Sequence, residues 1–260
     1  MWLPVVFAVI LLKNCDSAKL DYEFEELRFH CVFDQLNDNY GCNIKNLVVK
    51  SRDSQIVEVS GLHKSGHLDN DVMTLYSFNS VSPYMPKKLG FVFPNLKTIL
   101  MTKTNLRLIE FRDFKNMKRL QKLYLPENQI EKVSFCTFRY ADNLEVIDLS
   151  GNRIVELPED VFVNLHNLQQ FIANDNIIEH LEAGLFRNNT NLRKVSLNTN
   201  QISVVEINFM KIRGIELVDL RFNVCVNLSF GCCKGPALRE FNVQMSENCT
   251  GQKSDEKFLA

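Results

Sequence analysis

Apolar residues recur at a fixed spacing along more than half of the chain. Six segments share the order apolar-x-x-apolar-x-apolar, and they begin at Leu96, Leu120, Leu144, Leu168, Leu192 and Ile215. Their starts lie 24 residues apart four times and then 23. A second apolar column keeps the same step and contains Phe114, Phe138, Phe162, Phe186 and Met210. Two columns with one period indicate a stack of similar structural units.

Each unit predicts a short strand followed by a turn. In the apolar-x-apolar run, two side chains point inward and the residue between them points outward. An asparagine follows each strand, and its amide can bond the loop backbone of neighbouring units; these residues are Asn128, Asn152, Asn176, Asn200 and Asn223. Thr104 takes this place in the first clear unit, so we expect a looser turn there.

The unit L-x-x-L-x-L-x-x-N-x-I is the signature of a leucine-rich repeat, and it predicts an α/β fold. We expect a leucine-rich-repeat solenoid, or horseshoe, with a parallel sheet on its concave side and disulfide-stabilised caps. The repeats occupy residues 96–224. A divergent first repeat covers residues 56–95, because a step back of 24 from Leu96 places Val72, Leu75, Ser77 and Met85 in the pattern.

The cysteines cluster where a solenoid needs its ends covered. Cys31 and Cys42 bracket a short loop, whose closure is worth about 3 kcal/mol in the chain-entropy model. Near the other end lie Cys225, Cys232, Cys233 and Cys249. The adjacent residues Cys232 and Cys233 are poorly placed to form a disulfide with each other, which leaves two possible pairings among the four cysteines.

Cys136 stands alone in the middle repeats. Without Cys15, which lies in the leader segment, eight cysteines become seven, so one has no partner within the chain. We expect Cys136 to be that residue, as a free thiol or as the bridge of a disulfide-linked dimer. A small buried apolar side chain is the alternative interpretation.

The start of the chain predicts export. The apolar run from Trp2 to Leu12 has signal-peptide length, and residues 1–17 form the expected signal peptide. The remaining residues, 18–260, form one domain with an N-terminal cap at 18–55, a cysteine cap at 225–249 and a polar tail at 250–260. The expected product is secreted and not inserted in a membrane. A net charge of −1 gives no electrostatic case for nucleic acid.

Motifs of catalysis and metal binding are absent from the sequence. It contains no HExxH, GxSxG, CxxC or GxGxxG, so we expect neither an enzyme nor a cofactor. His63 and His67 lie near Asp69 and Asp71, but Gly66 and polar neighbours indicate a loop, and we predict no metal site. Three sequons predict glycosylation at Asn188, Asn227 and Asn248, the last in doubt because oxidation of Cys249 competes with it.

The outward strand residues predict where a partner would bind. They form two adjacent columns on the concave sheet, with neighbouring strands about 4.8 Å apart. Apolar residues in these columns are not required by the core. The predicted binding strip, with its polar flank, consists of Leu100, Lys122, Tyr124, Val146, Gln170 and Ile172. An aromatic beside aliphatic residues is typical of a binding hot spot, although scattered surface hydrophobes are the plain alternative.

Motifs on both sides of the repeats resemble those of a particular group of leucine-rich-repeat proteins. The Cys31 and YGC cap, the segment GLHKSGHLDNDVMTL, the tetrapeptide FPNL and the ending DLRFNVC with a later CC and C resemble small secreted leucine-rich proteins of flies and mosquitoes. The double cysteine is similar to that of the mosquito leucine-rich immune proteins. The resemblance covers about residues 29–249. Long members carry a C-terminal coiled coil that joins partners, and this sequence has no heptads after Cys249, so the resemblance implies a coil-less member.

Function follows from the resemblance and not from the repeat itself, because this fold serves many roles. The resemblance implies innate-immune recognition of a protein or microbial-surface ligand through the concave face. An extracellular matrix adhesion protein or a developmental signalling ligand is the alternative. Induction of the transcript by infection would favour immunity, and tissue-patterned embryonic expression would favour the alternative.

Overall fold

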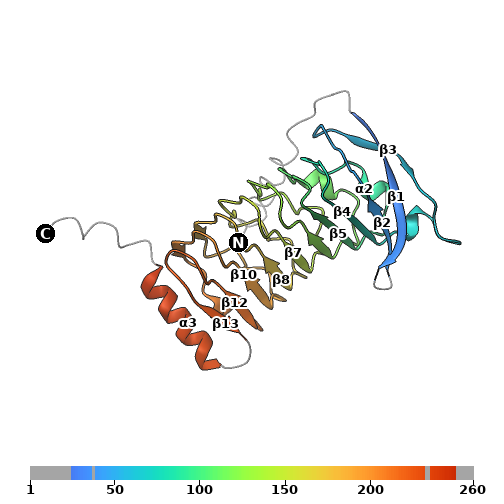
Figure 1. The fold of residues 1–260 in the computed structure, drawn as a ribbon. Coiled ribbons are helices and arrows are strands. Elements are labelled where there is room, and N and C mark those ends of the chain that lie inside the picture. Colours follow the sequence, from blue (N-terminus) through green and yellow to red (C-terminus); the bar gives the residue numbers. More distant parts are fainter. Residues whose placement is uncertain (1–24, 37–38, 232–234, 250–260) are drawn as a thin grey trace, which may run out of the picture.

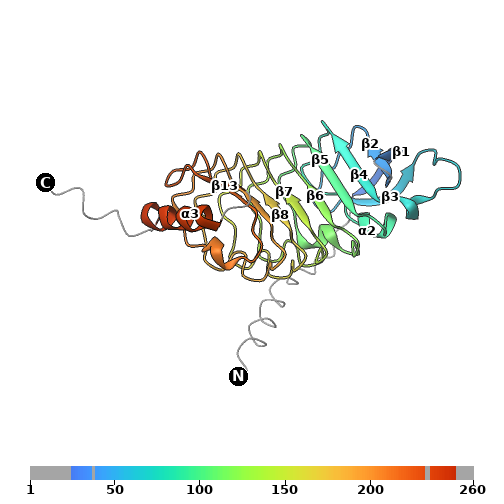
Figure 2. The same cartoon turned by 90° about the horizontal axis from the view of Figure 1, so that it is seen from below.

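The computed structural model describes residues 25–36, 39–231 and 235–249 of the 260-residue chain. The predicted signal peptide, Cys232, Cys233 and the polar tail lie outside these ranges. The fold is a leucine-rich-repeat solenoid, as predicted, with a β hairpin at one end and a helix at the other (Figure 1). Its coils lie side by side along one axis (Figure 2).

One continuous sheet of 11 strands runs through the described part of the chain, in the order β13-β12-β10-β8-β7-β6-β5-β4-β2-β1-β3. Its parallel strands are β4 (Thr74–Phe78), β5 (Thr98–Thr102), β6 (Lys122–Tyr124), β7 (Val146–Asp148), β8 (Gln170–Ile172), β10 (Lys194–Ser196) and β12 (Leu217–Asp219). The inward side chains of each strand are fully buried, as for Leu123 and Leu125. The strand β4 belongs to the divergent unit, and Val72, Leu75, Ser77 and Met85 are buried there.

The opposite side of the array consists mainly of turns and short helices. These are η1 (Asp69–Asp71), α2 (Leu89–Val92), η2 (Phe111–Phe114) and η3 (Phe209–Lys211), with a small parallel pair of β9 (His180–Leu181) and β11 (Val204–Val205). Successive rings of the phenylalanine column lie 6.0, 6.0 and 5.6 Å apart from Phe114 to Phe186. This column closes the core against solvent.

The last member of that column was predicted wrongly. Met210 is 52% exposed, and Phe209 occupies the core position with no exposed surface. The repeat starts shorten to a step of 23 between Leu192 and Ile215. The same step applied to Phe186 leads to residue 209, so the convex turn keeps the shorter period.

The asparagine ladder joins each coil to the one before it. In one coil, the Asn152 amide donates to the carbonyls of Leu125 and Leu149 at 3.0 and 2.8 Å and accepts from the Ile130 N–H at 2.9 Å. Thr104 does not loosen its turn, contrary to expectation. Its N–H and its hydroxyl both donate to Asn128 Oδ1 at 2.9 Å, so the smaller side chain still joins the ladder.

The N-terminal cap is a hairpin and not merely a closed loop. Strands β1 (Glu26–Leu36) and β2 (Asn39–Ile44) pair antiparallel, and the disulfide Cys31–Cys42 joins them. Strand β2 then pairs parallel with β4, which continues the sheet into the first coil. Strand β3 (Gln55–Ser60) pairs with β1 and forms that edge of the sheet.

The C-terminal cap reverses the sheet and then covers it. Strand β13 (Ser229–Gly231) pairs antiparallel with β12, and helix α3 (Gly235–Asn248) packs against the last coil. The buried residues Phe241 and Met245 of α3 belong to the core, and the Phe241 ring lies 6.2 Å from that of Phe209. A disulfide joins Cys225 to Cys249, which settles one bond of this cap.

The structure contradicts the prediction, made from the number of cysteines, that Cys136 has no partner within the chain. Cys136 is 7% exposed and disulfide-bonded, to a partner outside the described residues. The prediction that Cys136 is a free thiol or the bridge of a dimer depended on leaving out Cys15. The full chain has eight cysteines, an even number that permits complete pairing.

Candidate binding surface

The strand register places the predicted binding residues in two lateral rows. Leu100 pairs with Tyr124, which pairs with Asp148, which pairs with Ile172. The adjacent row runs from Lys122 through Val146 to Gln170. The six predicted residues therefore share one face of the sheet, but the carboxylate of Asp148 separates Tyr124 from Ile172.

Exposure differs among these six side chains. Lys122 is exposed, Val146 is 8% exposed, and Leu100, Tyr124, Gln170 and Ile172 are half-buried. Burial, and then the nearby Asp148, raises the pKa of the Tyr124 hydroxyl above its ordinary value. A phenol is already protonated at physiological pH, so Tyr124 can offer a hydrogen-bond donor beside an apolar ring.

Two aromatic residues extend this row toward the N-terminal cap, and sequence reasoning missed them. Tyr76 pairs in register with Leu100, its ring lies 6.0 Å from that of Phe78, and its hydroxyl donates to Asp34 of β1. Phe78 is 45% exposed, whereas Tyr76 is buried at 5% exposed and supports the Phe78 ring from below the surface. A step back of 24 from Leu100 leads to Tyr76, so the repeat itself carried the signal. The divergent unit contributes the aromatic end of the surface.

The C-terminal half of the same face is polar and internally bonded. The Ser196 hydroxyl donates to Asn174 Oδ1 at 2.8 Å, and the Asn198 amide donates to Asp219 at 3.2 Å. Arg221 makes two bonds to Asp219, at 2.9 and 2.7 Å, and these lower the pKa of that carboxyl. Periodicity could not reveal this network, because its members come from strands and turns of three coils. The concave face thus has an aromatic half and a polar half.

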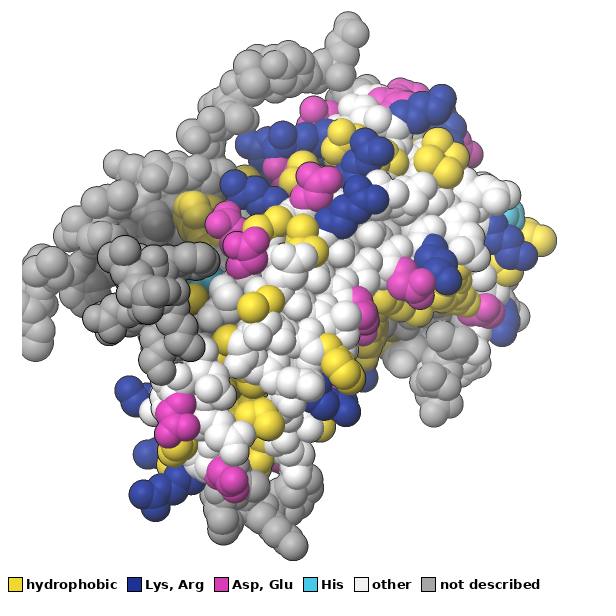
Figure 3. Space-filling model, turned by 60° about the vertical axis from the view of Figure 1, so that its left-hand side comes forward, with side chains coloured by type: hydrophobic (Ala, Val, Ile, Leu, Met, Phe, Trp, Pro, Cys, Tyr) yellow, Lys and Arg dark blue, Asp and Glu magenta, His cyan; other side chains and the backbone are white. Residues whose placement is uncertain are grey.

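Charges of both signs are mixed on the face of the molecule that Figure 3 shows. On the face shown in Figure 3, lysine and arginine side chains alternate with aspartate and glutamate, and apolar side chains form small groups between them. The net charge of −1 agrees with this mixture. Neither sign of charge dominates the face seen in this view.

His63 and His67 hold the loop after β3 against the hairpin of β1 and β2. His63 Nε2 lies 3.1 Å from Asp69, its Nδ1 lies 2.9 Å from the Tyr40 hydroxyl, and its ring stacks on Phe33 at 3.8 Å. The His67 ring stacks on Tyr40 at 4.2 Å. Both nitrogens of His63 thus have polar neighbours, and the contacts explain these residues as a structural cluster.

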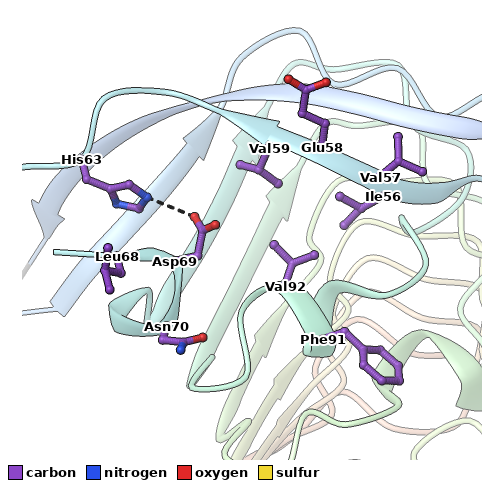
Figure 4. A pocket seen from close by; sticks show the side chains of 10 residues that line it. All are labelled: Ile56, Val57, Glu58, Val59, His63, Leu68, Asp69, Asn70, Phe91 and Val92. Carbon is purple, nitrogen blue, oxygen red and sulfur yellow. Dashed lines mark hydrogen bonds and ion pairs between the residues drawn. The ribbon is translucent and has the colours of Figure 1, made fainter.

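A cavity of about 650 Å³ lies beside this cluster. His63 and Asp69 face each other at one end, while Val57 and Phe91 lie at the other (Figure 4). Phe91 is 60% exposed. The cavity is open and mixes apolar with polar side chains.

A second group of charged side chains lies on the small sheet. Within the described ranges, one set of three candidate metal donors occurs, namely His180, Glu182 and Glu206, with the donor atoms within 4.8 Å of one another. The His180 Nδ1 faces Glu182 at 3.6 Å, and its Nε2 faces Glu206 at 3.5 Å. The two ring nitrogens face different carboxylates, so the His180 ring lies between Glu182 and Glu206.

The three sequons differ in surroundings. Asn227 and Asn248 are exposed, whereas Asn188 is half-buried and donates its Nδ2 proton to the Val163 carbonyl at 3.0 Å. Glycosylation needs a free Nδ2, so the geometry favours Asn227 over Asn188 as a substrate. None of the helices in the described part has the length and apolar composition to span a bilayer.

Comparison with known proteins agrees with the architecture. A leucine-rich-repeat family profile matches residues 118–178. No curated protein sequence matches the chain significantly. Two solved structures of mosquito proteins are similar at 20% identity and a TM-score of 0.63: the LRIM1/APL1C complex, with 76% of this chain and 35% of that chain covered, and the APL1 leucine-rich-repeat domain, with 77% and 49% covered.

The Toll–Spatzle complex of Drosophila is also similar, at 16% identity and a TM-score of 0.54, with 70% of this chain and 29% of that chain covered. The chain thus spans between about a third and a half of the length of these proteins. Likeness at such identities shows the fold alone. What the fold and its surface define is a leucine-rich-repeat scaffold, a class that typically binds other molecules and does not catalyse reactions.

Proposed function

We propose that this chain is a secreted recognition protein of insect innate immunity, which binds a protein or microbial-surface ligand on its concave face. The carrying observation is that the half-buried Leu100 and Tyr124 lie side by side, with the exposed Phe78 on the neighbouring strand β4. Aromatic and aliphatic side chains thus share a surface that the core does not require. Lys122 and Asp148 provide a polar rim. Such a composition is typical of the centre of an interface.

Export is part of this proposal and has its own support. Both described disulfides join segments near the ends of the array, and disulfides persist in oxidising compartments. The similar structures include complexes named for immune and developmental roles, since the Toll–Spatzle complex is called a hub of development and innate immunity. The same description supports the second candidate, a developmental or adhesion ligand.

A paired substitution tests the concave site. We expect Tyr124→Asp with Ile172→Asp to abolish binding of the purified protein to heat-killed bacteria and to their cell-wall fractions, because both changes place a charge in the apolar row. Both positions are half-buried at the surface and outside the core, so secretion and melting temperature should stay nearly unchanged.

The matched control is Val155→Asp, which adds one charge at a 43% exposed residue outside the strands of the concave sheet. This variant should bind like the unaltered protein. Equal bacterial binding by the double variant would contradict the concave site. Binding to cultured cells or matrix, with none to bacteria, would favour the adhesion role.

A further inference from the structure

In each of the six clear coils, the residue directly before the ladder position has a left-handed backbone conformation. These residues are Lys103, Glu127, Gly151, Asp175, Thr199 and Phe222, with φ between 53° and 65°. The N–H of each residue but the last donates to a carbonyl of the following coil, as Glu127 does to Ser150 at 2.8 Å. The repeating turn thus depends on an acceptor that the next coil supplies.

The final coil has no following coil, and a side chain replaces the missing acceptor. The Phe222 N–H donates to the side-chain Oδ1 of Asn227 at 2.9 Å. The turn that brings them together is held by bonds from Leu220 N–H to the Leu228 carbonyl at 2.9 Å and from Asn223 N–H to the Val226 carbonyl at 3.1 Å. Asn227 therefore completes the backbone ladder at the end of the array.

Phe222 is the exception among the left-handed residues. The other five positions hold lysine, glutamate, glycine, aspartate and threonine. Phe222 is 64% exposed and its neighbour Val224 is 71% exposed. A bulky residue rarely adopts positive φ, so the backbone conformation does not favour phenylalanine at this position. Because most of the ring is exposed, packing in the core does not favour it either. The pair gains stability only if another group covers it.

Asn227 can carry such a group without losing its structural bond. It begins the sequon Asn227-Leu228-Ser229, is exposed, and uses only Oδ1 among the contacts of the described chain. Oligosaccharide transfer forms a bond between Nδ2 and the first sugar carbon. The carbon–oxygen bond to a lipid pyrophosphate donor breaks, the lipid pyrophosphate leaves with the electron pair, and the amide loses one proton. Oδ1 remains an acceptor for Phe222.

We propose that an N-linked glycan on Asn227 packs its first sugars over Phe222 and Val224. The C–H faces of a sugar supply an apolar surface to an aromatic ring, and its hydroxyls face water. The glycan accordingly shields the apolar pair from water.

The test uses the full chain secreted from cultured insect cells. Peptide mass spectrometry should show a glycan on Asn227. Ser229→Ala removes the sequon and keeps the Asn227 amide, while Ser229→Thr, the control, preserves the sequon. We expect Ser229→Ala to lower the melting temperature by about 2–4 °C and to increase binding of a hydrophobic dye, with no change in Ser229→Thr.

A second variant separates packing of the glycan from a general effect of glycosylation. Phe222→Lys introduces a lysine at this turn, and Lys103 already adopts the same left-handed conformation at the equivalent position of another coil. Ser229→Ala should have little additional effect on melting or dye binding in the Phe222→Lys background. An unmodified Asn227, or an equal effect of Ser229→Ala in both backgrounds, would overturn the proposal. A dimer of unglycosylated protein that Phe222→Lys dissociates would assign the patch to a second copy instead.

Discussion

At the scale of single residues, the ladder asparagines contribute more than a turn preference. One amide joins two coils, because its Nδ2 donates to carbonyls of both and its Oδ1 accepts an N–H of the earlier coil. Asn152 is 7% exposed, so water cannot replace these bonds readily. Buried backbone groups without partners are costly, which explains why a polar residue recurs inside an apolar stack.

Replacement of Asn152 by leucine tests this account. We expect Asn152→Leu to lower the free energy of unfolding by about 1–3 kcal/mol although it adds apolar surface, because the Ile130 N–H and the Leu125 carbonyl lose their partner. Thermal and denaturant unfolding measure the change. Asn167→Leu, at an exposed position, is the control and should be nearly neutral. Unchanged stability in Asn152→Leu would show that the hydrogen bonds of the ladder asparagines do not stabilise the fold.

At the scale of elements, the sequence predicted the repeating strands but not the hydrogen bonds that connect different coils. The strands follow from apolar-x-apolar alternation, and the register then follows from the common period. That reasoning placed Leu100 beside Tyr124 and joined Tyr124 to Ile172 through Val146 of the adjacent row, since Asp148 lies between them in their own row. The bonds among Ser196, Asn174 and Asp219 connect different coils, and no period in one column encodes them.

The convex turn η3 shows how a local change in period shifts an element. Phe209 is fully buried there and Met210 is half-exposed, although the 24-residue column favoured Met210. We expect Phe209→Ala to destabilise the protein by about 3–5 kcal/mol through lost burial and a residual cavity. Met210→Ala should change stability by less than about 0.5 kcal/mol. Chemical denaturation of the two variants compares them, and a larger effect at Met210 would restore the original register.

At the scale of the whole molecule, the two caps close opposite ends of a one-dimensional array. Each coil contacts chiefly its neighbours, so stability is a sum of local terms and the ends can open separately. The hairpin of β1 and β2 covers one end, and α3 covers the other through Phe241 and the Cys225–Cys249 bond. The N–H of Val205 also donates to the Cys249 carbonyl at 3.1 Å, which fastens the end of the helix to the convex side.

Removal of the C-terminal disulfide should therefore open one end and leave the rest folded. With a separation of 24 residues, the bond contributes about 3 kcal/mol in the chain-entropy model. In the paired variant Cys225→Ser with Cys249→Ser, we expect hydrogen exchange to rise first in α3 and β13 and then in β12, while β5 to β7 keep their protection. The matched pair Cys31→Ser with Cys42→Ser should raise exchange in β1 and β2 instead. Uniform loss of protection along all coils in either variant would show that the array unfolds as one cooperative unit, and the caps would then stabilise every coil together.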